Sequence, residues 1–123
     1  MSRYFNEDEV HQLIPQLQYH FSKLIQSKQA MGRLSFKLKK LGFEPQLLGI
    51  LSQEENLEAY ALQAKIKIYY EQFKDHLFAI EQMGGQIKDL ELGRVDFPSQ
   101  VASQPGFFTW QLGLTDRPVF LSA

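Results

Sequence analysis

The sequence predicts an α+β fold, in which a long antiparallel helical hairpin is followed by a small antiparallel β-sheet of hairpins. Two long stretches carry apolar residues at helical spacing, and each is bounded by helix start and stop signals. After Gly85 the pattern changes to short runs separated by turns that contain glycine and proline. A chain of 123 residues fits one domain, with the helical hairpin at 6–83 and the sheet at 84–123.

The first helix is expected over 7–41. Asn6 is a favourable N-cap, and Glu9 follows at the spacing of a capping box. Pro15 lacks the N–H that would bond back along the helix, so it predicts a bend and not an end. Gly42 supplies the signal for the C-terminus of the helix.

The second helix is expected over 53–83, with Ser52 and Glu55 at capping-box spacing and Gly84 ending it. At 1.5 Å per residue the two helices span about 52 Å and about 46 Å. Two helices of similar length joined by a short connection predict an antiparallel hairpin.

Four strands are expected in the last third of the chain, at 86–90, 94–97, 107–112 and 119–121. A three-residue loop at 91–93 would let Gly93 take the left-handed position of a bulged turn. This register pairs Lys88 with Asp96 and Asp89 with Val95. It avoids placing the two aspartates opposite each other, which like charges disfavour.

The two aspartates of this hairpin are candidate site residues. In this register Asp96 shares a face with Lys88 and Arg94, as a solvated member of a surface ion pair. Asp89 lies on the apolar face of the strand. We expect its carboxylate to accept backbone N–H groups from a nearby turn; the alternative is a carboxylate with a raised pKa in a functional site.

Histidines extend that alternative. In an antiparallel hairpin His11 and His76 fall at the same end as the sheet, so a site built from His11, His76 and Asp89 is geometrically conceivable. Solvated or core histidines are far commoner, and we expect neither a resident metal nor a cofactor. None of the strong catalytic or phosphate-binding motifs occurs in the sequence.

Composition restricts the function further. The chain has no cysteine, which excludes disulfides, thiolate metal sites and cysteine nucleophiles. Thirteen basic and fourteen acidic residues nearly balance, so nucleic-acid binding is not expected, although the stretch 33–40 is basic. No apolar run is long enough to span a membrane and no leader is recognisable, which predicts a cytoplasmic protein.

Three segments carry a resemblance to a known family: "FNEDEVHQLIPQL" at 5–17, "GGQIKDLELGRVDFP" at 84–98 and "TWQLG" at 109–113. They resemble the domain of unknown function 2203, a family of small bacterial proteins. The resemblance implies that the characteristic positions of the family are Lys88–Leu90, Gly93, Val95–Pro98, Trp110, Leu112 and Gly113. Many members continue with a Trp-His-Glu stretch, whereas this chain ends "RPVFLSA". The family supplies no function.

The functional hypothesis rests on the length of the apolar helical hairpin compared with that of the sheet. Four short strands of about 20 Å cover only one end of a hairpin of about 50 Å. The uncovered positions predict a homodimer, and another protein is a further possible partner. The predicted interface consists of Leu24, Met31, Leu34, Leu38, Leu47, Leu48, Ile50 and Leu51. We therefore expect a non-enzymatic, self-associating interaction module; the alternative is an enzyme or a ligand- or metal-binding protein with a site around Asp89.

Overall fold

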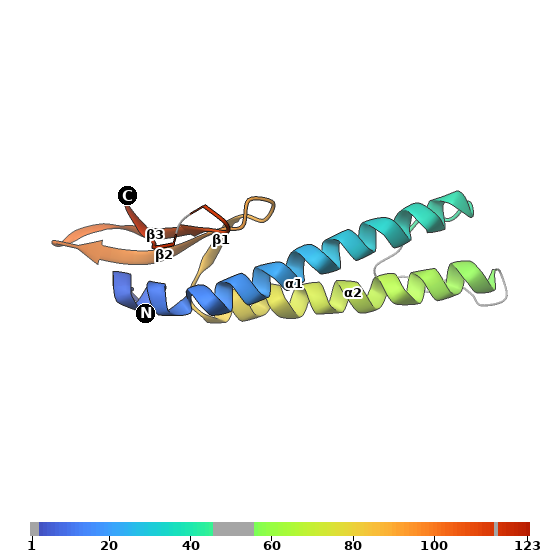
Figure 1. Ribbon diagram of the computed structural model, residues 1–123, viewed down its shortest axis with the longest axis horizontal. Helices are drawn as coiled ribbons and strands as arrows, with labels where there is room; N and C mark the ends of the chain where they lie inside the picture. Colours follow the sequence, from blue (N-terminus) through green and yellow to red (C-terminus); the bar gives the residue numbers. More distant parts are fainter. Residues whose placement is uncertain (1–2, 46–55, 115) are drawn as a thin grey trace. The chain divides into compact units, whose positions relative to one another are not determined.

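The computed structural model describes residues 3–45, 56–114 and 116–123 (Figure 1). Two helices, α1 (Glu7–Lys40) and α2 (Leu57–Gln82), precede four strands. The strands are β1 (Gln86–Asp89), β2 (Arg94–Val101), β3 (Gln104–Gln111) and β4 (Val119–Ser122), and they form one antiparallel sheet in the order β1-β2-β3-β4. The predicted α+β class, with a helical hairpin before a sheet of hairpins, is confirmed.

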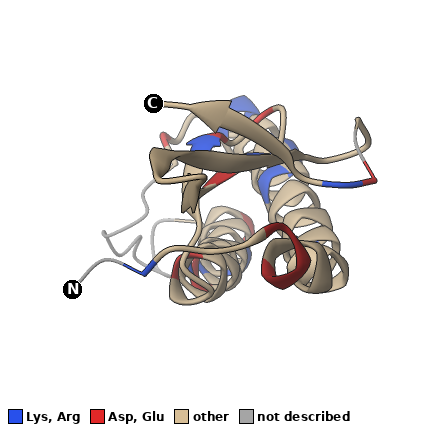
Figure 2. Ribbon diagram, turned by 90° about the vertical axis from the view of Figure 1, so that its left-hand side faces the viewer, with Lys and Arg blue, Asp and Glu red and all other residues tan. Residues whose placement is uncertain are grey.

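The start of α1 is a reciprocal capping box, as predicted. Asn6 Oδ1 accepts the N–H of Glu9 at 2.8 Å, and Glu9 Oε1 accepts the N–H of Asn6 at 3.1 Å. The pKa of Glu9 is held below its ordinary value by this backbone hydrogen bond from Asn6 and by a hydrogen bond from Arg3. Three acidic residues occupy the first turn, where they complement the helix dipole (Figure 2). The helix continues through Pro15.

The start of α2 is set by Asn56. Its Oδ1 accepts the N–H of Ala59 at 2.9 Å, and its carbonyl accepts the N–H of Tyr60 at 2.9 Å. The predicted start at residue 53 and its cap at Ser52 lie outside the described residues. At the other end Gly84 adopts a φ of 97°, as expected for a glycine that follows a helix.

The chain divides into two compact units, one of residues 1–21 and 77–123 (unit 1) and one of residues 22–76 (unit 2). In unit 1 the beginning of α1 packs on the inner face of the sheet. The rings of Phe5 and Phe97 pack edge to face with their centroids 5.1 Å apart, and the ring centroids of Phe21 and Trp110 are 5.9 Å apart. Phe5 also donates its N–H to the carbonyl of Pro98 at 2.8 Å. The segment before α1 is thus fixed to β2.

Unit 2 is a pair of packed helical segments with a core of its own. Leu38 of α1 and Ala59 and Ile66 of α2 form a buried cluster, which Met31, Leu34, Leu41, Phe43 and Leu62 surround. Leu24 is also buried. From the sequence we predicted that these leucines would stay exposed, because the sheet is too short to cover them. They are not exposed, since α2 itself covers the inner face of α1.

The longest hairpin of the sheet was only partly predicted. The strand expected at 94–97 extends to Val101, and the strand expected at 107–112 begins earlier, at Gln104. The turn between them is Ala102-Ser103. Both turn residues have positive φ, 52° and 67°, although neither is glycine. Pro98 and Pro105, taken as turn signals, lie inside β2 and β3.

The register predicted for the β1–β2 hairpin is wrong. Gln86 pairs with Asp96, Ile87 with Val95, and Asp89 with Arg94, with an irregularity between Ile87 and Asp89. The loop spans 90–93, one residue longer than expected, and the bulge absorbs the difference. Gly93 does take positive φ, at 72°. Asp89 and Asp96 are not opposite each other in either register.

Candidate functional site

Asp96 is a buried ion-pair member and not a solvated one. Its side chain keeps 6% of its surface exposed, and Arg94, two residues earlier on the same face, donates Nε at 3.2 Å and a second nitrogen at 3.3 Å. Thr109, directly opposite on β3, donates its hydroxyl at 2.8 Å. The prediction of a solvated Asp96 is wrong because it considered only the pairing of β1 with β2, whereas Thr109 lies opposite Asp96 on β3. The Asp96 carboxylate therefore finds its hydrogen-bond donors within the sheet, and its role is structural.

Asp89 performs the local duty that was expected of it. It is half-buried, and its Oδ1 accepts the N–H of Leu92 at 2.9 Å, which closes the turn between β1 and β2. A side chain occupied in this way shapes the loop. The structure therefore favours the structural interpretation of Asp89 over that of a site carboxylate.

The two histidines do not complete a metal site. His11 is exposed on α1, and His76 is half-buried on α2 and engaged in an interaction of its own. Across 3–45, 56–114 and 116–123, no group of three or more His, Cys, Asp or Glu side chains could hold a metal ion. Among the candidate site residues, Asp96 accepts hydrogen bonds from two side chains, those of Arg94 and Thr109.

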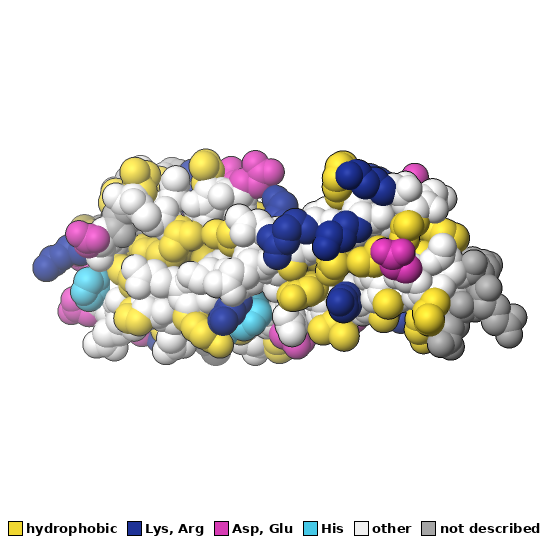
Figure 3. Space-filling model, turned by 45° about the vertical axis from the view of Figure 1, so that its right-hand side comes forward, with side chains coloured by type: hydrophobic (Ala, Val, Ile, Leu, Met, Phe, Trp, Pro, Cys, Tyr) yellow, Lys and Arg dark blue, Asp and Glu magenta, His cyan; other side chains and the backbone are white. Residues whose placement is uncertain are grey.

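The predicted interface residues have mixed positions. Leu24 and Leu38 are buried within the chain and Met31 and Leu34 are half-buried, so together they offer little exposed surface. Leu47, Leu48, Ile50 and Leu51 lie outside the described residues. Exposed apolar side chains do occur on the helices, at positions that the sequence analysis did not select (Figure 3).

The most regularly spaced of these exposed apolar residues lie on the first three turns of α2. Leu57, Ala61, Ala64 and Ile68 follow one another at intervals of four, three and four residues, and all four are exposed. Leu57 is 64% exposed and Ile68 58%. We call these four residues the α2 stripe. Its signal was present in the sequence as heptad spacing, but it was hidden because the inner face of α2 is apolar as well.

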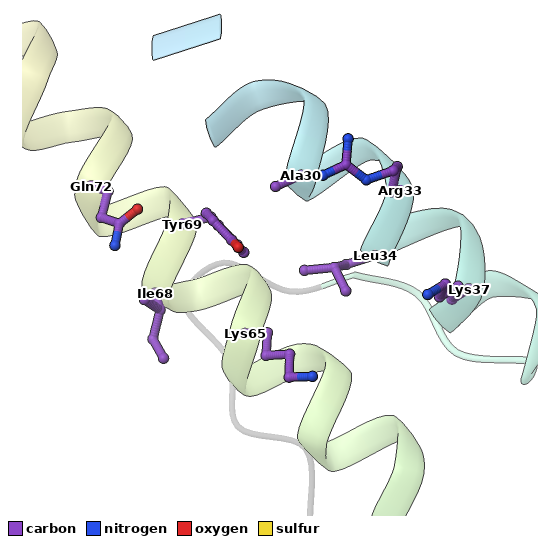
Figure 4. A pocket seen from close by; sticks show the side chains of 8 residues that line it. All are labelled: Ala30, Arg33, Leu34, Lys37, Lys65, Ile68, Tyr69 and Gln72. Carbon is purple, nitrogen blue, oxygen red and sulfur yellow. The ribbon is translucent and has the colours of Figure 1, made fainter. Parts of the chain in front are cut away.

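A hollow of about 370 Å³ lies between α1 and α2 within unit 2 (Figure 4). Its rim carries Arg33 and Lys37 from α1 and Lys65 from α2. Tyr69 and Leu34 point toward one another from the two helices. Hollows in unit 1 are lined by Arg3, which already pairs with Glu9. The hollow in unit 2 is therefore the better candidate for a ligand, and we call it the basic groove.

Comparison with known proteins adds a family and no activity. Neither helix of the structure, over the residues it describes, is long and apolar enough to cross a membrane. No curated protein matches the chain, and no solved structure matches it. The family model described as "Uncharacterized conserved protein (DUF2203)" matches residues 3–116, which is nearly the whole sequence. The chain therefore belongs to the DUF2203 family of uncharacterized conserved proteins.

Proposed function

We propose that this protein is a non-enzymatic interaction module that self-associates through the α2 stripe. The observation that carries the proposal is that one segment of α2 is apolar on two opposite faces. Ala59 and Ile66 are buried against α1, and the stripe residues lie two positions away from them, about half a turn around the helix. A helix with a second apolar face at coiled-coil spacing needs a second helix to cover it.

The residues of the stripe are complementary to a second copy in the antiparallel direction. When two stripes are centred between residues 62 and 63, Leu57 meets Ile68 of the other copy and Ala61 meets Ala64. Glu58 and Lys65 lie along the same edge of the stripe, so Glu58 of each copy then faces Lys65 of the other. Such flanking charges set the orientation of paired helices. A parallel pairing brings no opposite charges together within the described part of the stripe.

The expected association is weak. Fully burying a leucine or isoleucine contributes about 1.5–3 kcal/mol, so the exposed parts of Leu57 and Ile68 contribute about 1–2 kcal/mol each. Over two copies this is roughly 4–8 kcal/mol, which the loss of translational and rotational freedom reduces. A net free energy of about 4 kcal/mol, at the lower end of this range, corresponds to a dissociation constant on the order of 1 mM.

Sedimentation equilibrium from 10 µM to 1 mM tests the proposal. The wild type is expected to shift from monomer toward dimer over this range, and Ile68→Glu is expected to stay monomeric at every concentration. Phe78→Glu is the matched control, because Phe78 is equally exposed on α2 (61%) but lies outside the stripe. It should dimerise like the wild type. A wild type that is monomeric at 1 mM, or equal effects of the two substitutions, would overturn the proposal.

A charge exchange tests the orientation. Glu58→Lys should weaken the dimer, since it places like charges across the interface, and adding Lys65→Glu should restore it. Restoration in the double variant is specific to the pairing of residue 58 with residue 65. If the two effects simply add, the antiparallel arrangement is wrong.

A further inference from the structure

The charge of the basic groove is one-sided. Its lining includes three cationic side chains, Arg33, Lys37 and Lys65, and no acidic one. Within the described parts of the chain none of the three forms an ion pair. By contrast, Lys74, which follows the groove residues on α2, forms an ion pair with Glu71 at 3.2 Å. Cations gathered around a hollow without counter-charge attract an anion to that hollow.

The floor of the groove is apolar and contains an aromatic ring. Ala30 is buried, and Leu34 and Tyr69 are half-buried between the two helices. Figure 4 shows that Lys65 and Lys37 reach toward the space beside this floor, while Gln72 lies one turn further along α2. A ligand in the groove therefore meets a flat hydrophobic surface on one side and cationic groups at its edges.

We propose that the basic groove binds a small aromatic phosphate ester. A phosphate monoester carries about two negative charges and three acceptor oxygens, which suits several cations that line one hollow from two helices better than a single carboxylate does. Arg33 offers a planar fork of donors, and the two lysines offer point charges. The aromatic body of the ligand lies against Tyr69 and Leu34, where ring packing adds to the apolar contact. The volume of about 370 Å³ is within the range of small-molecule sites.

The proposal does not depend on self-association. Arg33, Lys37 and Tyr69 are not members of the α2 stripe, so the groove exists in a single copy. Ile68 belongs to the α2 stripe and also lines the groove, and Lys65 lines the groove and flanks the stripe. Binding is therefore measured at a protein concentration of about 20 µM, well below the expected dissociation constant of the dimer. A failure of ligand binding leaves the dimer proposal intact, and a monomeric wild type leaves the groove proposal intact.

The test is an NMR titration of the full chain with three probes: phenyl phosphate, inorganic phosphate and phenol. Phenyl phosphate is expected to shift the backbone amide signals of residues 30–37 and 65–72 in a saturable way, with a dissociation constant on the order of 1 mM. Because neither the charge nor the ring suffices alone, phosphate and phenol should each bind at least about fivefold more weakly. Raising the salt concentration from 50 mM to 300 mM should weaken phenyl phosphate binding.

Exposed substitutions locate the site without disturbing the fold. Lys37→Gln and Arg33→Gln should each weaken phenyl phosphate binding about two- to fivefold, as the loss of one exposed charge contact predicts. Lys39→Gln is the matched control, since Lys39 is an exposed cation of the same helix outside the groove. Tyr69→Phe should keep the preference for phenyl phosphate over inorganic phosphate, and Tyr69→Ala should reduce it.

Four results would overturn the proposal. These are shifts that do not saturate, shifts outside the groove, equal losses in Lys37→Gln and Lys39→Gln, and equal affinity for inorganic phosphate and phenyl phosphate. Binding of an acidic peptide such as hexaglutamate in the groove, without binding of phenyl phosphate, would identify a protein-docking surface and would likewise overturn it.

Discussion

Removing the guanidinium that covers Asp96 should destabilise the sheet more than an ordinary surface substitution does. Asp96 is 5% exposed and its carboxylate is held by Arg94 and Thr109. In Arg94→Met the aliphatic stem is kept, but the buried charge retains only the Thr109 hydroxyl. Breaking a fully buried pair costs about 3–5 kcal/mol. Because the Arg94 side chain is 38% exposed, solvent screening reduces this, and we expect about 2 kcal/mol.

The assay is urea unfolding at pH 7, followed by circular dichroism. For a chain of this length 1 kcal/mol corresponds to roughly 3–4 °C in Tm, so thermal melting provides a second readout. Asp96→Asn should cost about 1 kcal/mol, since Thr109 can still bond to the amide and Arg94 can turn to solvent. In the double variant the losses should fall short of additivity by about 1 kcal/mol.

Arg117→Met is the control, because Arg117 is exposed and belongs to the same unit without covering a carboxylate. It should change stability by less than about 0.5 kcal/mol. The reasoning is refuted if Arg94→Met behaves like this control, or if the effects at Arg94 and Asp96 are strictly additive.

Three further predictions concern the backbone and the helix start. Replacing the β2–β3 turn by Ala102→Asn with Ser103→Gly should stabilise the protein by about 1 kcal/mol in urea unfolding, since Asn-Gly accepts the positive φ of both positions; destabilisation would contradict the turn geometry. Gly84→Ala should lower Tm by several degrees, because φ is 97° and a Cβ would lie 2.4 Å from the ring of Phe5; an unchanged Tm would show that this contact is not made. The depressed pKa of Glu9 means that its charge stabilises the folded state above pH ~4.3, and that this contribution is lost as pH falls through the lower folded-state value. In urea midpoints Glu9→Gln should therefore be less stable than wild type at pH 7, and the gap should narrow as the pH is lowered from 5 toward 3, while a gap that does not change with pH would implicate the cap geometry instead of the charge.

The helix starts could be predicted from sequence wherever the signal is local. The capping box of Asn6 and Glu9 involves residues three apart, so neighbouring letters specify it. Asn56 was missed because Ser52 and Glu55 offer the same spacing a few residues earlier. The expectation that Asp89 accepts an N–H from a turn was also correct, because its partner lies only three residues away.

The sheet was predicted less well because tertiary contacts override its local signals. Pro98 reads as a strand terminator, yet within β2 its carbonyl accepts the N–H of Phe5, a residue from the other end of the chain. Ala102-Ser103 forms a turn with no glycine or asparagine to announce it. Thr109 lies opposite Asp96 on β3 and donates its hydroxyl to it, a pairing that no local signal in the sequence announces.

The exposure of the leucines of α1 was predicted wrongly for a related reason. Periodicity identifies apolar faces, but it does not say which face another part of the chain will cover. The inner face of α1 was taken as free because α2 was not counted as its cover, whereas Leu24 and Leu38 are buried. The α2 stripe and the basic groove both emerge only after α1 and α2 are paired, since the pairing decides which residues stay exposed and which lie between the two helices.

A distance between two copies tests the central claim most directly. The chain has no cysteine, so Asp75→Cys provides a single site for a spin label, on an exposed position of α2 beyond the stripe. In the antiparallel dimer Asp75 lies about 12.5 residues from the centre of the pair, which places the two labels about 38 Å apart along the helix axis. Double electron–electron resonance at 1 mM protein should give a distribution near this distance, and adding Ile68→Glu should abolish it. A distance below about 20 Å, as parallel helices would give, or the absence of dipolar coupling in the labelled Asp75→Cys protein, would contradict the account.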